Sequence, residues 1–246
     1  MAAVVAERIG HGPQRVLVLH GWFGPSVYDG FFDTFDPEQF DIAIVHNSGY
    51  GLARGQQPAA DITEQAQQHL AVADELGWAA FDIIGHSYGG MLSTRHVTDH
   101  PETPALVLLS AGRGGRENIS GGQEKLFAMD RTAELKSQAQ ELVKAGRGHT
   151  LLQLPGWWWV ISAQSFLDRL ENVPDTLSLA KQIHCPVLAL RGDQEDRIRY
   201  PAEEFQAACD GPCDVAVIEN CDHFYNQRET EVAARVAGWL QKTLGL

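Results

Sequence analysis

The sequence predicts an α/β fold in which helices flank a mostly parallel sheet. Short runs rich in Val, Ile and Leu have continuous apolar centres, which is typical of strands buried on both faces. These runs alternate with helical stretches along the chain, and this alternation favours a parallel sheet. With 246 residues, of which 44% are hydrophobic, the chain can bury one large core, and its composition marks no break into two independent domains.

The predicted strands are short and apolar. Residues 15–20 read Arg-Val-Leu-Val-Leu-His and are followed by a glycine, as expected where a buried strand ends in a turn. Residues 4–8 are expected to add an antiparallel strand at one edge of the sheet. The other expected strands are 40–45, 81–84, 105–109, 186–190 and 214–218.

Helices are expected between these strands. Asp61 is a plausible N-cap for a helix over 61–76, and Pro101 is expected to stop a helix over 88–100. Two further helices are predicted at 202–209, after a proline, and at 229–244.

The stretch between the strands at 105–109 and 186–190 breaks the alternation. From about residue 113 to residue 184 no convincing strand is found, whereas 123–145 and 162–170 have helical character. A long insertion between sheet strands is usually functional when it lies at the carboxyl edge. We therefore expect a core domain formed by residues 1–112 and 185–246, and a helical cap formed by residues 113–184.

The expected cap concentrates tryptophan. Trp157, Trp158 and Trp159 are half of the six tryptophans in the chain. These rings either pack the cap onto the core or line an apolar substrate pocket, and the sequence leaves both roles open.

Charge and cysteine content argue against several classes of protein. The net charge is −13 and the clustered Lys and Arg of a nucleic-acid surface are missing, so no nucleic-acid partner is expected. Cys185, Cys209, Cys213 and Cys221 lack the paired spacing of a zinc site, so we expect no metal and no cofactor. No segment approaches the roughly 18 to 20 apolar residues of a membrane span, and the amino terminus is unlike a signal peptide. A cytoplasmic protein with a small-molecule substrate is the expectation, and its oligomeric state is left open.

One short motif predicts a catalytic serine. The segment 85–89 reads Gly-His-Ser-Tyr-Gly and follows an apolar run directly, so it lies where a strand should turn sharply into a helix. This is the pattern of a nucleophile elbow. Glycines on both sides of Ser87 have a steric reason, because a tight turn crowds the strand against the helix.

A serine hydroxyl needs a base, and that base needs an acid to fix its tautomer. His223 follows the strand at 214–218 and precedes the last helix, which is the place that the chain order serine, acid, histidine requires. Asp193, Glu195 and Asp196 all follow the strand at 186–190. The residues by themselves leave the choice among these three carboxylates open.

These features together resemble the α/β-hydrolase superfamily over nearly the whole chain. Residues 20–22, His-Gly-Trp, resemble the family's oxyanion motif. The serine motif at 85–89 resembles its nucleophile elbow, and residues 222–224, Asp-His-Phe, resemble its histidine segment. The family's acid is usually followed by Arg or His, an aliphatic residue and a proline, and 196–201 matches that half of the pattern. The resemblance therefore favours Asp196, although Glu195 holds the usual spacing from Gly192.

The resemblance implies acyl transfer to Ser87, with His223 as base and Asp196 as its orienting acid. The backbone N–H groups of Trp22 and Tyr88 would form the oxyanion hole, and the side chain of Phe23 would help to line the pocket. His20 would shape the oxyanion loop.

A serine hydrolase is therefore expected, cleaving an ester, thioester or lactone of a small, largely apolar substrate. Two alternatives stay open. One is a carbon–carbon bond hydrolase of aromatic degradation, which uses the same residues, and the other is a non-catalytic ligand receptor on the same fold.

Overall fold

The sheet is seen in a computed structural model that describes residues 5–116, 132–153 and 160–245. Within these residues seven strands are ordered β1-β3-β2-β4-β5-β6-β7. β1 pairs antiparallel with β3, and the other pairings are parallel, so the predicted fold class and edge strand are confirmed. The strands are β1 (Val5–Gly10), β2 (Gln14–Leu19), β3 (Phe40–His46), β4 (Asp82–His86), β5 (Leu106–Leu109), β6 (Val187–Gly192) and β7 (Cys213–Ile218).

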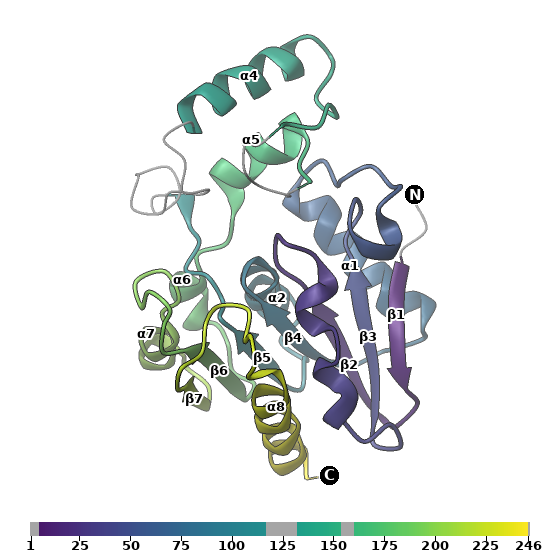
Figure 1. Cartoon of the computed structure of the whole chain (residues 1–246), viewed down its shortest axis with the longest axis vertical. Helices are drawn as coiled ribbons and strands as arrows, with labels where there is room; N and C mark the ends of the chain where they lie inside the picture. The colour runs from purple at the N-terminus through teal and green to yellow at the C-terminus, as the bar shows by residue number, and fades with distance from the viewer. Residues whose placement is uncertain (1–4, 117–131, 154–159, 246) are drawn as a thin grey trace.

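Helices flank the sheet on both faces (Figure 1). One face carries α1 (Ile62–Glu75), α2 (Tyr88–Asp99), α6 (Thr176–Ala180) and α7 (Ala202–Ala208). The other carries α8 (Glu229–Leu244) and the 3-10 turns η1 (Pro25–Tyr28) and η2 (Phe31–Thr34). Asp61 caps α1 as predicted, because its side chain accepts a hydrogen bond from the backbone N–H of Glu64 at 2.8 Å. None of the helices in the described ranges is long and apolar enough to cross a bilayer.

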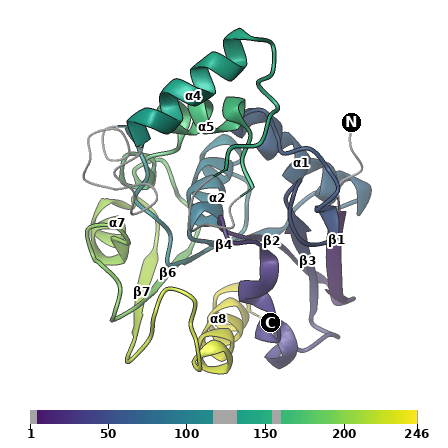
Figure 2. The same ribbon diagram turned by 45° about the horizontal axis from the view of Figure 1, so that its top comes forward.

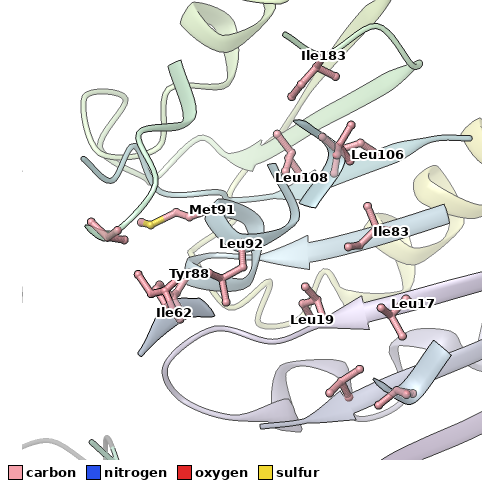
Figure 3. Packing of buried hydrophobic residues seen from close by; sticks show 14 of the residues in the cluster. Leu17, Leu19, Ile62, Ile83, Tyr88, Met91, Leu92, Leu106, Leu108 and Ile183 are labelled. Carbon is pink, nitrogen blue, oxygen red and sulfur yellow. The ribbon is translucent and has the colours of Figure 1, made fainter. Parts of the chain in front are cut away.

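Strands β2 to β6 bury both of their faces, which explains their continuous apolar runs, whereas the edge strands β1 and β7 are partly exposed. Alternate residues such as Leu17, Leu19 and Ile83 belong to one buried cluster with Tyr88 and Leu92 of α2 (Figure 3). The residues between them face the opposite layer, which includes side chains of η2 and α8. A parallel sheet covered in this way has all of its loops at two edges, and the loops at the carboxyl edge meet over one crevice.

The segment between β5 and β6 carries α4 (Thr132–Lys144), α5 (Ala163–Asn172) and α6. Its described residues contain two isolated bridges and no longer strand. α4 and α5 lie beyond the carboxyl ends of the parallel strands (Figures 1 and 2), whereas α6 packs against α2 and α7. The boundaries of the expected core and cap stay a prediction.

Candidate active site

Ser87 lies at a strained turn between β4 and α2. Its backbone angles are φ 55° and ψ −117°, a conformation that residues other than glycine rarely adopt. A Cβ atom on Gly85 would lie 2.5 Å from the carbonyl oxygen of Gly89, and one on Gly89 would lie 2.3 Å from that of Leu19. The steric reason predicted for both glycines is therefore confirmed, and the turn leaves the Ser87 side chain half-buried at the carboxyl edge.

His223 lies against Ser87 from the loop between β7 and α8. Its Nε2 is 3.1 Å from Ser87 Oγ, and its Nδ1 is 2.6 Å from Glu195 Oε1. With Nδ1–H donating to the carboxylate, Nε2 is left to accept the serine proton. His86 donates from Nε2 to the carbonyl oxygen of His223 at 2.8 Å, and burial lowers the pKa of His86 well below its usual range. His86 therefore holds the His223 backbone as a neutral side chain.

The structure brings Glu195, and not Asp196, to the histidine, so the expected placement of Asp196 is wrong. The side chain of Glu195 is only 2% exposed. Asp196 is exposed and accepts a hydrogen bond from the backbone N–H of Ile198, within its own turn. Asp193 accepts one from the backbone N–H of Cys221, and so ties its loop to the loop that precedes His223. The three carboxylates thus have separate partners, and Glu195 alone among them contacts His223.

The second carboxylate oxygen of Glu195 has contacts that the sequence did not suggest. Oε2 accepts hydrogen bonds from Ser110 Oγ at 2.6 Å and from the backbone N–H of Gly192 at 2.7 Å. Ser110 Oγ lies 2.7 Å from the hydroxyl of Tyr225. A sequence signal for Ser110 existed, because it follows the β5 run directly and so falls at the same sheet edge as Ser87 and Glu195.

The backbone groups expected to form an oxyanion hole lie close to Ser87. Tyr88 is the first residue of α2, where helix N–H groups have no intrahelical acceptor. A Cβ on Gly21 would lie 2.9 Å from Ser87 Cβ, so the backbone next to Trp22 approaches the serine closely. The rings of Trp22 and Tyr88 pack with centroids 5.3 Å apart.

His20 supports this loop. Its Nδ1 lies 2.6 Å from the carbonyl oxygen of Gly21, and its Nε2 accepts a hydrogen bond from the backbone N–H of Asn47 at 3.1 Å. Burial lowers the pKa of His20 to about 4, so its ring is neutral at neutral pH. The neutral ring thereby joins the end of β2 to the loop after β3.

A recess opens beside the Trp22–Tyr88 pair, and much of its lining is polar. Arg169 of α5 donates from Nε to the hydroxyl of Tyr88 at 3.2 Å and from a terminal nitrogen to Gln65 Oε1 at 3.3 Å, with its guanidinium over the Tyr88 ring. The other lining residues are Gly21, Trp22, Asn47, Ser48, Tyr50, Pro58, Ala59, Gln68 and Val160.

The residues predicted to bind substrate are not seen to line this recess. Phe23 is 40% exposed and packs against Phe224, with ring centroids 5.4 Å apart, and it does not line this recess. Trp157, Trp158 and Trp159 lie outside the described residues, so their expected role stays a prediction. Across residues 5–116, 132–153 and 160–245, no group of three or more His, Cys, Asp or Glu side chains is arranged to hold a metal ion.

Comparison with known proteins gives a match to the model of the alpha/beta hydrolase family over residues 16–235. One curated relative comes from Cupriavidus necator and is named as the dihydrolipoyllysine-residue acetyltransferase component of its acetoin cleaving system. The two sequences are 24% identical over a match that covers 57% of this chain and 38% of the relative. Another, the pimeloyl-[acyl-carrier protein] methyl ester esterase of Edwardsiella ictaluri, is 30% identical over 42% of this chain and 38% of its own. The matches therefore span well under two thirds of the length of these relatives.

Solved structures show the same fold. The esterase of Exiguobacterium antarcticum has a TM-score of 0.70 at 19% identity, covering 97% of this chain and 95% of its own. The similarity thus extends across the sheet and the helices on both of its faces.

Proposed function

Because this chain belongs to the alpha/beta hydrolase family, we propose that it is a serine hydrolase that cleaves a carboxylic ester, thioester or lactone through an acyl-enzyme on Ser87. One observation carries the proposal. An unbroken path of hydrogen bonds runs from Ser87 Oγ to His223, at 3.1 Å, and on to Glu195, at 2.6 Å. The path has the order and the contacts of a nucleophile, its base and the acid that orients the base.

In the proposed reaction Ser87 Oγ attacks the substrate carbonyl while its proton moves to His223 Nε2. The carboxylate of Glu195 stabilises the imidazolium that forms. His223 then gives the proton to the leaving alcohol or thiol as the carbon–oxygen or carbon–sulfur bond breaks. Water next attacks the acyl-enzyme, with His223 again taking and returning a proton, and this step releases the acid and restores Ser87.

The negative charge that develops on the carbonyl oxygen needs donors that are already in place. We assign this role to the backbone N–H groups of Tyr88 and Trp22. The position of Tyr88 at the start of α2 supports the assignment, because the helix dipole favours an anion there. The close approach of Gly21 to Ser87 supports the assignment of Trp22.

The described recess modifies our expectation about the substrate. A largely apolar substrate was expected from the aromatic residues of the cap segment. The recess next to the proposed oxyanion site instead offers Arg169, Gln65, Gln68 and Ser48 alongside Trp22 and Tyr88. The recess has room for little more than one water molecule, so we propose only that a polar group next to the reacting carbonyl contacts this lining. The E. ictaluri relative, named as a methyl ester esterase, supports ester cleavage as the chemistry.

The experiment that tests the proposal removes the nucleophile. Ser87→Ala should abolish turnover of a short-chain p-nitrophenyl ester, because no acyl-enzyme can form. Ser178→Ala, at an exposed position of α6, is the matched control and should keep the activity of the unsubstituted protein. A fluorophosphonate should add the mass of its phosphonyl group, with loss of HF, to the unsubstituted protein and not to the Ser87→Ala variant.

Other outcomes would point to other functions. Undiminished ester turnover in Ser87→Ala would refute the proposal. Labelling of Ser87 without turnover of esters, thioesters or lactones would favour a ligand receptor. Turnover of a vinylogous diketone without turnover of esters would favour carbon–carbon bond hydrolysis.

A further inference from the structure

The side chain of Glu195 is held by more than its bond to His223. Its Oε1 points to the histidine, and its Oε2 accepts from the backbone N–H of Gly192 and from the hydroxyl of Ser110. Ser110 comes from the end of β5, whereas Glu195 follows β6. The carboxylate is therefore held by its own loop, through the Gly192 N–H, and also by a hydroxyl from a neighbouring strand. The two contacts together fix its rotation more fully than the loop contact would alone.

Tyr225 completes a chain of hydroxyl groups. An ionised carboxylate can only accept hydrogen bonds, so Ser110 must use its one hydrogen toward Glu195. The hydroxyl of Tyr225, 2.7 Å from Ser110 Oγ, must then be the donor of their shared hydrogen bond. The direction of donation is thus fixed from Tyr225 to Ser110 to Glu195. Ser110 and Tyr225 are each only 1% exposed, so water does not compete freely for these bonds.

Backbone strain gives an independent sign that these two positions are constrained. Ser110 has a φ of 46° and Tyr225 a φ of 60°. Neither is glycine, and a bulky aromatic residue in this left-handed region is an outlier. Such conformations cost on the order of 1–3 kcal/mol each, and they persist where the surrounding structure requires them. The same kind of strain occurs at Ser87, so three members of one hydrogen-bonded path share it.

We propose that Ser110 and Tyr225 are positioning residues for Glu195, which keep its carboxylate aimed at His223 Nδ1. The inference rests on the proposed function and adds two residues to it. Hydrogen bonds donated to a carboxylate are stronger than bonds between neutral groups, so they orient it firmly. The nearest cation on β6, Arg191, is occupied by a two-point ion pair with Glu203 and donates its remaining terminal nitrogen to the carbonyl of Gly192. The hydrogen bonds that orient Oε2 of Glu195 therefore come from Ser110 and the Gly192 N–H, and not from Arg191.

The first variant is Ser110→Gly. It removes the hydroxyl, and glycine adopts a φ of 46° without strain, so the change should not destabilise the turn by a backbone clash. With a p-nitrophenyl ester, kcat should fall about 10- to 100-fold while KM stays within about twofold, which is the effect of losing a charge-assisted hydrogen bond.

The second variant is Tyr225→Phe, with Tyr28→Phe as its matched control. Tyr225→Phe should lower kcat about three- to tenfold, because it acts on Glu195 only through Ser110. Tyr28 is also buried, but its hydroxyl donates to the carbonyl oxygen of Leu19 and not to the chain. Tyr28→Phe should keep kcat within about twofold.

A spectroscopic signal tests the inference without any substrate. The proton on His223 Nδ1, held in a bond of 2.6 Å to a buried carboxylate, should give a far-downfield proton resonance that His223→Ala abolishes. This resonance should shift upfield or broaden in Ser110→Gly and in Tyr225→Phe, and should be unchanged in Tyr28→Phe. If the protein turns out not to cleave esters, the resonance still reports whether the chain positions Glu195.

The inference would be overturned if both variants kept kcat within about twofold and left the resonance unchanged while thermal melts showed them folded. If Ser110→Gly does not fold, Tyr225→Phe decides by the same two readouts.

Discussion

The carboxylate of Glu195 accepts hydrogen bonds from three donors. It reaches His223 with one oxygen, and with the other it accepts from Ser110 and from the backbone of Gly192. An aspartate there would be shorter by one methylene, and it could not keep all three contacts without movement of the loop. The neighbouring aspartates have the shorter side chains that suit bonds to nearby backbone N–H groups, and they make such bonds.

The backbone conformation of Ser87 is strained, and the contacts around it must offset the free energy of that strain. A φ of 55° at a serine costs on the order of 1–3 kcal/mol. The contacts around it keep this conformation, since the Ser87 backbone N–H donates to Leu109 at 2.9 Å and the Gly90 N–H donates to the Ser87 carbonyl at 3.0 Å. The turn thereby places the Ser87 hydroxyl 3.1 Å from His223 Nε2.

At the scale of elements, the side chain of Arg169 joins α5 to the proposed site. Arg169 is 8% exposed, donates to both Tyr88 and Gln65, and stacks over the Tyr88 ring at 4.8 Å from its centroid. It therefore connects α5 to α1 and to the first residue of α2. Tyr88 is also the proposed oxyanion donor, so its ring links the position of α5 to the geometry of the site.

Arg169→Met tests that link. We expect the free energy of unfolding to fall by about 1–3 kcal/mol, because buried hydrogen bonds and a cation–π contact are lost together. We also expect KM to rise more than kcat falls, because the recess lining changes while the Ser87–His223 contact remains. Urea unfolding and steady-state kinetics measure the two effects. Arg147→Met, at an exposed position after α4, is the control. If the two variants had the same free energy of unfolding and the same KM, the link would be contradicted.

At the scale of the whole molecule, buried titratable groups make stability depend on pH in two opposite ways. Burial lowers the pKa values of His20 to about 4 and His69 to about 3. These histidines take up protons more readily in the unfolded chain, so they reduce stability as pH falls below about 6.5. Asp82 is fully buried, and burial raises its pKa to about 7. The folded protein favours the neutral form of Asp82. The stabilising contribution of this group to the free energy of unfolding is therefore fully present below about pH 4, and it is lost as pH rises through 7.

Asp82→Asn should therefore stabilise the protein at alkaline pH. Relative to the unsubstituted protein, the gain in unfolding free energy should be on the order of 1–3 kcal/mol above about pH 8 and should shrink toward zero near pH 4. The difference isolates Asp82, because both proteins share the histidines. Urea midpoints across this range measure it, with Asp29→Asn at an exposed turn as control. A gain that is independent of pH would contradict the assigned titration.

Much of this architecture could be predicted from the sequence, because a doubly covered sheet leaves a strong pattern. The apolar runs located the strands, and the glycines around Ser87 located the elbow, since both follow from local sterics. The partner of His223 could not be chosen in the same way. Asp193, Glu195 and Asp196 are adjacent in one loop, and which of them turns inward depends on long-range contacts with Ser110 and with the loop at Cys221. The lining of the recess was equally hidden, because it combines residues from α1, α2 and α5.

The most direct test of the central claim is the rate at which a fluorophosphonate labels Ser87, followed by intact-protein mass spectrometry in Glu195→Gln and Asp196→Asn. The claim is that His223 activates Ser87 and that Glu195 orients His223. Glu195→Gln keeps the shape of the side chain but removes its charge, so labelling should slow by about 10²- to 10⁴-fold. Asp196→Asn should label within about threefold of the unsubstituted protein. Equal rates for the two variants, or slow labelling of Asp196→Asn alone, would contradict the account.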